Sequence, residues 1–346
     1  MEACKLPLLL VTNLTNIFYL TGFRGSAGVA VLGPSEGLLW VDPRYALQAR
    51  EQARGVEVIE AKGGLLKAAG RWLGGREARR VAYEDSNLTC ALFQALRCDC
   101  PRGVRFEPAR GLIEELRCVK DQEEIRRMRE AAQVTVAVFE EVVREVRPGV
   151  REGDLAAEIE YRMRQKGADG AAFETRVASG ARSALPHARA SPKRLGKSEL
   201  VLFDLGAILA GYAADMTRTV FLGKPSRRVR GLYHAVWESQ QRAVEAIQVG
   251  ARADAVDAVA RKALQHRGLA KYFTHSTGHG VGLEIHERPR LGRGEKARLQ
   301  VGFVVTAEPA IYLEGWGGIR IEDTVLVGPQ GAEILTPASK DHWIIS

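Results

Sequence analysis

The sequence predicts a two-domain α/β protein, with a small α/β domain at residues 1–117 and a larger α+β domain at residues 118–346. The chain has 346 residues, a length that suits about two domains. Short apolar runs separated by turns fill the first part, whereas a long amphipathic helical pattern begins at Lys120. Further along, two strand–turn–strand patterns each contain a pair of acidic residues. These changes of pattern predict two domains of different architecture.

The composition is typical of a globular protein, since 46% of the residues are hydrophobic and 27% are charged. The net charge of +8 could mark a nucleic-acid-binding surface or only an arginine-rich surface. We prefer the second explanation, because the basic clusters at 126–129 and 226–230 lack the aromatic residues that would stack on bases. We therefore expect no nucleic-acid partner.

Two further observations concern the compartment. The apolar run at 6–11 is too short to span a bilayer, and no small-residue cleavage site follows it. The five cysteines include no CxxC pair and no zinc-finger spacing, which favours free thiols in a reducing environment. We expect a cytoplasmic protein without a membrane partner.

The first domain begins with short apolar runs that are typical of strands. They lie at 7–13, 17–23 and 27–45. Within the last run, "GPSEG" at 33–37 predicts a hairpin turn. A further strand is expected around "VAYED" at 81–85 and a helix at "TCALFQALRC", residues 89–98. The pattern changes near 115–120, where we place the domain boundary.

The second domain begins with a predicted helix over 120–146. Its apolar residues at 125, 128, 132, 136 and 139 have the spacing of one buried stripe. Pro148 and Gly149 end this helix, because proline cannot continue it and glycine is common just beyond a helix terminus. A second helix is expected over 152–167.

Two predicted hairpins then place acids opposite one another. Residues 200–223 are two apolar, β-branched runs around Gly211, and folding them about positions 209–210 sets Asp204 close to opposite Asp215. Residues 302–328 repeat the arrangement with Glu308 and Glu322, whose midpoint is Gly315. Both hairpins therefore bring two carboxylates together.

Facing carboxylates among apolar neighbours repel and are costly to bury unless they are paired, protonated or bound to a cation. One such pair could be structural, but two pairs favour a metal site. With a histidine from "GHG" at 278–280, the acids form an oxygen and nitrogen ligand set suited to two divalent ions. The lack of a nearby thiolate favours a hydrolytic site with manganese, cobalt or zinc over a structural zinc site.

The sequence resembles the metal-dependent Xaa-Pro peptidases, prolidase and aminopeptidase P, through six ordered motifs. They are "SALPH" at 183–187, "FDLGA" at 203–207, "DMTRT" at 215–219, "GHGVGLEIHE" at 278–287, "AEPAIY" at 307–312 and "RIEDT" at 320–324. The first domain is similar to the creatinase-like N-terminal domain of that family through "TNLTNIFYLTGFRGSAG" and "DPRY". The resemblance implies a pita-bread fold for the second domain and short Xaa-Pro peptides as substrates.

The resemblance also implies roles for individual residues. One metal ion would be held by Asp215, His279, Glu308 and Glu322, and the other by Asp204, Asp215 and Glu322. The implied substrate-facing residues are His187, His275 and His286, of which His275 would wall the proline pocket. His187 or His286 would donate to the developing oxyanion, and Glu308 would shuttle a proton to the leaving nitrogen. Arg320 would orient the metal-binding acids.

Two activities remain open. A dipeptidase must recognise the free carboxylate of proline, and an arginine fork is suited to it. Arg290 and Arg44 are the candidates, although each could be a solvated surface charge. We favour prolidase, with aminopeptidase P as the alternative. A third possibility is a basic RNA- or ribosome-associated protein of the same fold, which would usually have lost its ligands. Because family members are commonly dimers, a homodimer is expected.

Overall fold

The structure is a computed structural model, and it describes residues 8–75, 80–100 and 103–345. The chain divides into two compact units, Met1–Arg117 and Cys118–Ser346. Pro7, with which the first predicted strand starts, lies outside the described residues. Each unit has its own sheets and helices and is described by itself.

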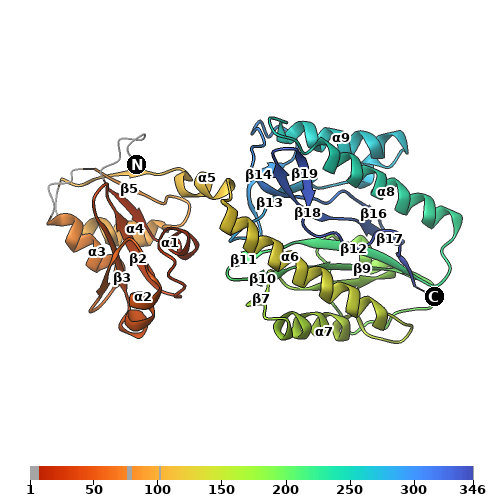
Figure 1. Ribbon diagram of the computed structural model, residues 1–346, viewed down its shortest axis with the longest axis horizontal. Helices are drawn as coiled ribbons and strands as arrows, with labels where there is room; N and C mark the ends of the chain where they lie inside the picture. Colours follow the sequence, from red (N-terminus) through yellow and green to blue (C-terminus); the bar gives the residue numbers. More distant parts are fainter. Residues whose placement is uncertain (1–7, 76–79, 101–102, 346) are drawn as a thin grey trace. The chain divides into compact units, whose positions relative to one another are not determined.

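The N-terminal unit is built on a mixed sheet (Figure 1). In the described part of this unit, the sheet order is β4-β3-β2-β1-β5-β6. The strands are β1 (Leu9–Val11), β2 (Gly28–Leu32), β3 (Gly37–Val41), β4 (Glu57–Glu60), β5 (Arg80–Tyr83) and β6 (Arg105–Pro108). Strands β2 and β3 form the predicted hairpin, in which Leu32 pairs with Gly37.

Helices cover both faces of this sheet. They are α1 (Leu14–Thr21), α2 (Ala46–Gln52), α3 (Leu65–Gly74), α4 (Cys90–Asp99) and α5 (Leu112–Cys118), with a 3₁₀ turn η2 (Pro43–Tyr45) before α2. Alternate strand residues point to opposite faces, so Leu10 packs with Leu73 of α3 and Leu96 of α4, whereas Leu9 packs with Ile17 of α1. The predicted α/β class and the helix at 89–98 are confirmed.

One predicted strand is wrong. The apolar run at 17–23 lies largely in helix α1, not in a strand. Local capping explains the difference: the Asn13 side chain accepts a hydrogen bond from the Thr15 N–H at the start of the helix, and Gly22 ends it in the left-handed conformation at φ 81°. Cap residues therefore outweigh the strand-like composition of this short run.

The C-terminal unit contains four further helices and fourteen strands in its described residues. Its helices are α6 (Gln122–Val142), α7 (Glu152–Gln165), α8 (Arg227–Ala246) and α9 (Ala253–His266), and its 3₁₀ turns are η3 (Val143–Glu145), η4 (Gly180–Ala184) and η5 (Ala270–Tyr272). Its strands are β7 (Gly170–Ala171), β8 (Arg176–Ser179), β9 (Glu199–Leu205), β10 (Ala207–Leu209), β11 (Tyr212–Ala213), β12 (Met216–Leu222), β13 (Gly278–Gly280), β14 (Glu287–Leu291), β15 (Val304–Ala307), β16 (Ala310–Leu313), β17 (Gly317–Arg320), β18 (Asp323–Gly328), β19 (Gly331–Ile334) and β20 (Ile344–Ile345).

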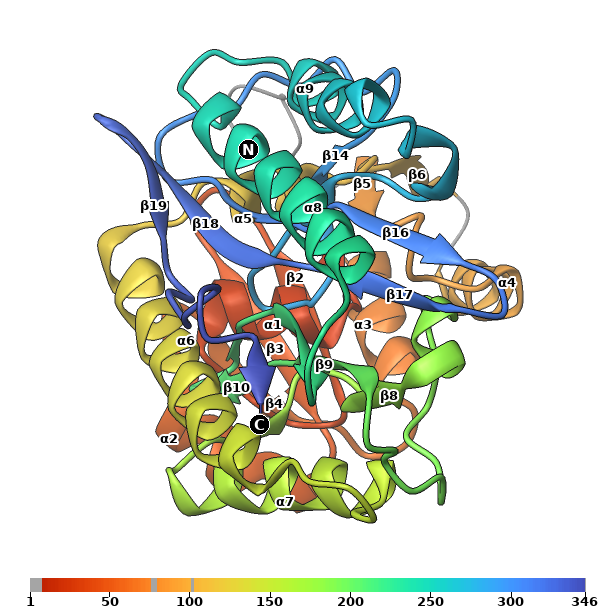
Figure 2. The ribbon, with the colours of Figure 1, turned by 90° about the vertical axis from the view of Figure 1, so that its right-hand side faces the viewer.

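Two helix pairs enclose the strands of this unit, as Figure 1 and the turned view in Figure 2 show. Helices α6 and α7 share a buried core with the sheet β20-β12-β9-β8. Helices α8 and α9 share a second core with the sheet β14-β13-β15-β18-β19. This is an α+β arrangement, as predicted, and its central strands carry the acids of the two hairpins.

The predicted first helix of the second domain is confirmed as α6, extended by η3. Asp121 begins it with a capping box in which its side chain accepts from the Glu124 N–H and Glu124 accepts from the Asp121 N–H. The buried stripe includes Ile125, Met128 and Phe139, whereas Val136 is only half-buried.

Across the described ranges, no helix is long and apolar enough to cross a membrane.

Candidate metal centre

The first acidic hairpin consists of β9 and β12, joined by the short strands β10 and β11. Asp204 pairs directly with Thr217, not with Asp215. The turn lies at Ala210 and Gly211, which have φ values of 50° and 88°, and this moves the register by two residues from the predicted one. A shift of two residues keeps the same side-chain face, because strand side chains alternate. Asp204 and Asp215 are both buried, at 3% and 5% exposure.

The second acidic hairpin has the predicted register. Ala307 pairs with Asp323 in one ladder, and Ala310 pairs with Arg320 in the next. Glu308 and Glu322 occupy matching positions between these two ladders. The Glu308 N–H donates to the Thr277 carbonyl, and the Glu322 N–H donates to the Thr217 carbonyl. The backbone contact of Glu322 with Thr217 joins the second hairpin to the first.

Strand β13 supplies His279, and the glycines on either side let neighbouring strands approach closely. A Cβ atom at Gly278 would lie 1.9 Å from the Thr306 carbonyl oxygen, and one at Gly280 would lie 2.3 Å from that of Arg288. Real Cβ atoms do not approach backbone atoms so closely. The glycines of "GHG" therefore have a packing role: they bring β13 against its neighbours.

His279 faces two of the acids. Its Nε2 lies 3.6 Å from Asp215 Oδ2 and 3.5 Å from Glu308 Oε1. Burial lowers the pKa of His279 to about 4, so the ring is neutral near pH 7. Its Nδ1 lies 3.0 Å from the Gly280 carbonyl oxygen, which can only accept, so Nδ1 carries the proton. Nε2 is therefore left with a free lone pair directed at the acids, which is the form that binds a metal ion.

The acids disfavour one another's charge. Burial, and then the charge of Asp204, raise the pKa of Glu322 to about 7. Burial, followed by the charge of Glu322, also raises the pKa of Asp215 and of Glu308 well above the usual range. Such a buried cluster of like charges is stabilised when cations lie between its members.

The donor set fits a divalent metal ion. Ligand atoms of Asp215, His279 and Glu322 all lie within 4.8 Å of one another. Carboxylate oxygens and a neutral imidazole nitrogen are ligands suited to manganese, cobalt and zinc. Both the geometry and the mutual repulsion of the acids thus favour a metal centre here.

Arg320 is 4% exposed and fixes the positions of two of the acids by hydrogen bonds. Its Nη2 donates to Asp204 Oδ2 at 2.5 Å, and its Nε donates to Thr217 Oγ1 at 2.9 Å. Thr217 in turn donates from Oγ1 to Glu322 Oε2 at 2.5 Å. One guanidinium therefore fixes an acid from each hairpin, one directly and one through a threonine.

Tyr312 links Arg320 to His275. Arg320 Nη1 donates to the Tyr312 hydroxyl oxygen at 2.9 Å, and His275 Nε2 lies 3.0 Å from the same oxygen. Burial lowers the pKa of His275 to about 4, and its Nδ1 lies 4.0 Å from Glu308 Oε2. The neutral His275 ring therefore lies at one side of the acid cluster.

His286 and His187 are the exposed histidines of the site. The His286 ring centroid lies 4.3 Å from that of His279. Partial burial of the rings, followed by the charge of Arg176, lowers the pKa of both histidines. The structure thus places His286 beside a predicted ligand, and it places His187 within the electrostatic reach of Arg176.

A buried glutamate holds the loop that carries His187. Glu152 Oε1 accepts from the backbone N–H and hydroxyl of Ser179, and Oε2 accepts from the backbone N–H and hydroxyl of Ser191. Arg182 also donates to Oε2, at 3.0 Å. Glu152 is completely buried, so one carboxylate fixes both ends of the loop 179–191.

Arg176, Glu152, Thr217 and Tyr312 are site residues that our sequence analysis does not assign. Arg176 Nη1 donates to Asp204 Oδ2 at 2.7 Å, because Arg176 of β8 pairs directly with Asp204 of β9. The sequence signal that could reveal this contact is the short β-branched segment "TRVAS" before "SALPH". Pairing it with β9 requires a register that the sequence does not specify.

The structure places the two candidate carboxylate-binding arginines differently. Arg290 is exposed and pairs directly with His279 across β13 and β14, so the two side chains leave the sheet on the same face. Arg44 belongs to the N-terminal unit, where its exposed guanidinium forms an ion pair with Asp42 at 2.7 Å. Only Arg290 therefore lies in the unit that contains the acids.

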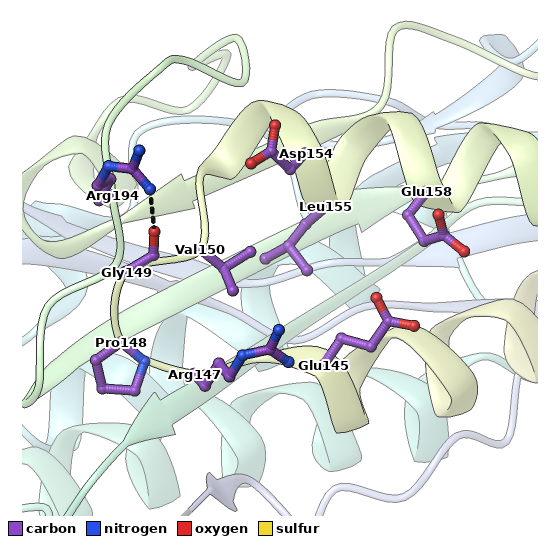
Figure 3. A pocket seen from close by; sticks show the side chains of 9 residues that line it. All are labelled: Glu145, Arg147, Pro148, Gly149, Val150, Asp154, Leu155, Glu158 and Arg194. Atoms are coloured by element: carbon purple, nitrogen blue, oxygen red, sulfur yellow. Dashed lines mark hydrogen bonds between the residues drawn. The ribbon is translucent and has the colours of Figure 1, made fainter.

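A surface pocket of about 590 Å³ between the end of α6 and the start of α7 is separate from this centre (Figure 3). Charged side chains of both signs line it, among them Glu145, Arg147, Asp154 and Arg194. Arg194 Nη1 donates to the Gly149 carbonyl oxygen at 2.7 Å. The pocket contains no predicted site residue, so the acid cluster, not this pocket, is the candidate site.

Comparison with known proteins agrees with this geometry. The profile of metallopeptidase family M24 matches residues 126–329, and that of the Creatinase/Prolidase N-terminal domain matches residues 1–119. The chain is 43% identical over 236 residues to an Xaa-Pro dipeptidase of Pyrococcus furiosus, covering 68% of each protein.

Two solved structures are similar over nearly the whole chain. An Xaa-Pro dipeptidase from Bacillus anthracis superposes with a TM-score of 0.95 at 37% identity, covering 99% of this chain and 96% of that one. An X-Pro aminopeptidase from Thermotoga maritima superposes with a TM-score of 0.91 at 35% identity, covering 98% of each chain. The expected creatinase-like and pita-bread domains are confirmed, and the chain belongs to metallopeptidase family M24, as a metal-dependent hydrolase with a Creatinase/Prolidase N-terminal domain.

Proposed function

We propose that this protein hydrolyses the Xaa-Pro bond of dipeptides with two divalent metal ions, preferably manganese. The ligands would be Asp204, Asp215, His279, Glu308 and Glu322. The observation that carries the proposal is the buried cluster of acids around the neutral Nε2 of His279, which needs cations to balance it. The similarity to Xaa-Pro dipeptidases over most of the chain supports the substrate.

A bound pair of divalent ions supplies a water of lowered pKa as nucleophile and polarises the scissile carbonyl. The protein's own groups handle the protons. Glu308 would pass a proton to the departing proline nitrogen. His187 or His286 would donate to the oxygen that becomes negative as the carbonyl is attacked.

His275 and Arg290 would recognise the proline residue of the substrate. The proline nitrogen of an Xaa-Pro bond carries no N–H and its ring fixes the backbone, so the residue must be recognised by shape. The neutral ring of His275, held by the Tyr312 hydroxyl, offers such a wall. Arg290, on the same face of the sheet as His279, would bind the free carboxylate of a dipeptide.

An aminopeptidase acting on longer Xaa-Pro peptides is the second candidate, because the Thermotoga maritima X-Pro aminopeptidase has nearly the same fold. Its substrate has no free carboxylate at proline, so Arg290 would have no partner there. Arg44 would exclude longer peptides if it reaches the substrate. Mutation of Arg44 or of Arg290 therefore tests whether the protein acts as a dipeptidase or as an aminopeptidase.

We also propose a homodimer in the cytoplasm that acts on small peptides and not on nucleic acid. Three of the described cysteines, Cys90, Cys98 and Cys100, are free thiols, which suits a reducing compartment. The basic net charge of +8 needs no nucleic-acid partner if arginines mainly form surface ion pairs, as Arg126 does with Glu123 and Glu130.

Product release from Ala-Pro and from Ala-Pro-Ala tests the proposal, with chelator-stripped protein assayed with and without manganese. Manganese-dependent cleavage of Ala-Pro with little cleavage of Ala-Pro-Ala is the expected result. Preferential cleavage of the tripeptide would instead establish the aminopeptidase. If neither peptide is cleaved with manganese, cobalt or zinc, the proposed activity is wrong.

A further inference from the structure

Arg176 places a second guanidinium beside the acids, and unlike Arg320 it is open to solvent. Its side chain is 26% exposed, whereas that of Arg320 is 5% exposed. The Nη1 of Arg176 donates a hydrogen bond to Asp204. Among the described residues, its Nε and Nη2 have no further hydrogen-bond partner. The guanidinium carbon also lies 5.3 Å from the centre of the Phe173 ring, which supports its flat face.

Once metal ions are bound, Arg176 would share the charge of Asp204 with a metal ion and with Arg320. Two divalent cations would balance four carboxylates, including Asp204, to which Arg176 is now paired. Arg320 keeps its hydrogen bonds to Thr217 and Tyr312. The Nε and Nη2 donors of Arg176, which is partly exposed, are therefore available for a negative group of the substrate.

The position of Arg176 indicates which part of a substrate it faces. A chain of hydrogen bonds runs from His275 through Tyr312 and Arg320 to Asp204. Arg176 is hydrogen-bonded to Asp204, which is the end of this chain opposite His275. If His275 walls the proline pocket, as the proposed function requires, Arg176 lies on the side of the residue that precedes proline. Its charge also acts on His187 and His286, which lowers their pKa together with burial.

We propose that Arg176 binds an acidic side chain on the residue before proline, so that Glu-Pro and Asp-Pro are preferred substrates. This inference rests on the proposed Xaa-Pro dipeptidase function and adds the substrate class. An arginine is suited to this role because its planar fork can donate two hydrogen bonds to one carboxylate. The proline carboxylate is the other anionic group of a dipeptide, but the proposed function assigns it to Arg290.

The test compares kcat/KM for Glu-Pro with kcat/KM for the nearly isosteric Gln-Pro, using the full-length manganese-loaded protein. The wild type is expected to favour Glu-Pro about tenfold, which is the effect of one charge-assisted hydrogen bond. Arg176→Gln should reduce this ratio to about one, and Arg176→Lys should retain part of it. Because both peptides are measured on each variant, a general loss of activity cancels in the ratio.

Two further measurements separate the possible explanations. Arg129→Gln, which removes a surface charge paired with Glu333, is the control and should keep the wild-type ratio. Manganese content of Arg176→Gln, measured by mass spectrometry, detects any effect that acts through Asp204. A wild-type ratio near one, or an unchanged ratio in Arg176→Gln, overturns the inference while Ala-Pro cleavage leaves the proposed function intact. Absence of Ala-Pro cleavage overturns both.

Discussion

At the residue scale, neighbouring groups determine what each side chain of the site can do. The Gly280 carbonyl fixes the proton of His279 on Nδ1, and burial keeps the ring neutral, so Nε2 is free to act as a ligand. Thr217 and Arg320 fix the carboxylates of Glu322 and Asp204 in a similar way. The ligand set is thus held in position by its own hydrogen-bond partners.

The first prediction concerns the two acids proposed to bridge the metal ions. Asp215→Ala or Glu322→Ala should abolish Ala-Pro cleavage and metal retention together, because each would contact both ions. Activity and metal content per chain are to be measured on the same preparation. A variant that retains two ions per chain would contradict the bridging assignment.

Much of the candidate site follows from the sequence, because hairpin partners are near in sequence, although Asp204 pairs two residues away from the predicted position. Glu308 and Glu322 have the predicted register about Gly315. Arg176 was missed because its partner Asp204 is 28 residues away on a strand reached through a long loop. Glu152 was missed for the same reason, since it is 39 residues from Ser191.

At the element scale, loops and strands are held by a few buried contacts. The loop 179–191 that carries His187 has both ends bonded to one carboxylate of helix α7. Strand β13 is held between β14 and β15 only because glycines flank His279. The apolar composition of residues 17–23 predicted a strand, but the segment lies largely in helix α1, because Asn13 and Gly22 cap a helix there.

Glu152→Gln should weaken the loop without removing any proposed ligand. We expect the free energy of unfolding to fall by about 2 kcal/mol or more, because an amide replaces an acceptor shared by five donors. The kcat for Ala-Pro should fall several-fold while manganese content is retained. Glu160→Gln on the exposed face of α7 is the matched control and should match the wild type in all three measurements. Loss of manganese in Glu152→Gln would contradict a role confined to the loop.

Two glycine substitutions should have opposite effects. Gly231→Ala lies within helix α8 with open space around the added methyl group, and it should stabilise the protein by up to about 1 kcal/mol. Gly278→Ala should prevent folding or metal binding, because its Cβ would overlap the Thr306 carbonyl. Denaturant unfolding and metal content check both outcomes. A folded, fully metal-loaded Gly278→Ala would contradict the packing role of the glycine.

At the scale of the whole molecule, two units with separate cores are joined in one chain, and the acids lie in the second unit. From the sequence we expect the domain boundary at residues 117 and 118, because the pattern of apolar residues changes near Lys120. The helices α8 and α9 were not assigned from sequence, although they share a buried core with the second sheet.

Metal removal should destabilise the C-terminal unit. Without a cation, the buried Asp204, Asp215 and Glu322 and the half-buried Glu308 repel one another when they are charged, so bound cations stabilise the folded state by mass action. Chelation should lower the melting temperature by about 5 °C or more, and excess manganese should restore it. Calorimetry measures both states, and an unchanged melting temperature in protein shown to be metal-free would count against the centre.

The central claim is that the acid and histidine cluster binds two metal ions that cleave Xaa-Pro dipeptides. The most direct test is a titration of chelator-stripped protein with manganese, in which bound metal and Ala-Pro cleavage are measured in the same samples. We predict no cleavage without metal and a maximum at two bound ions per chain. Full cleavage by metal-free protein, or no cleavage with both ions bound, would contradict the account.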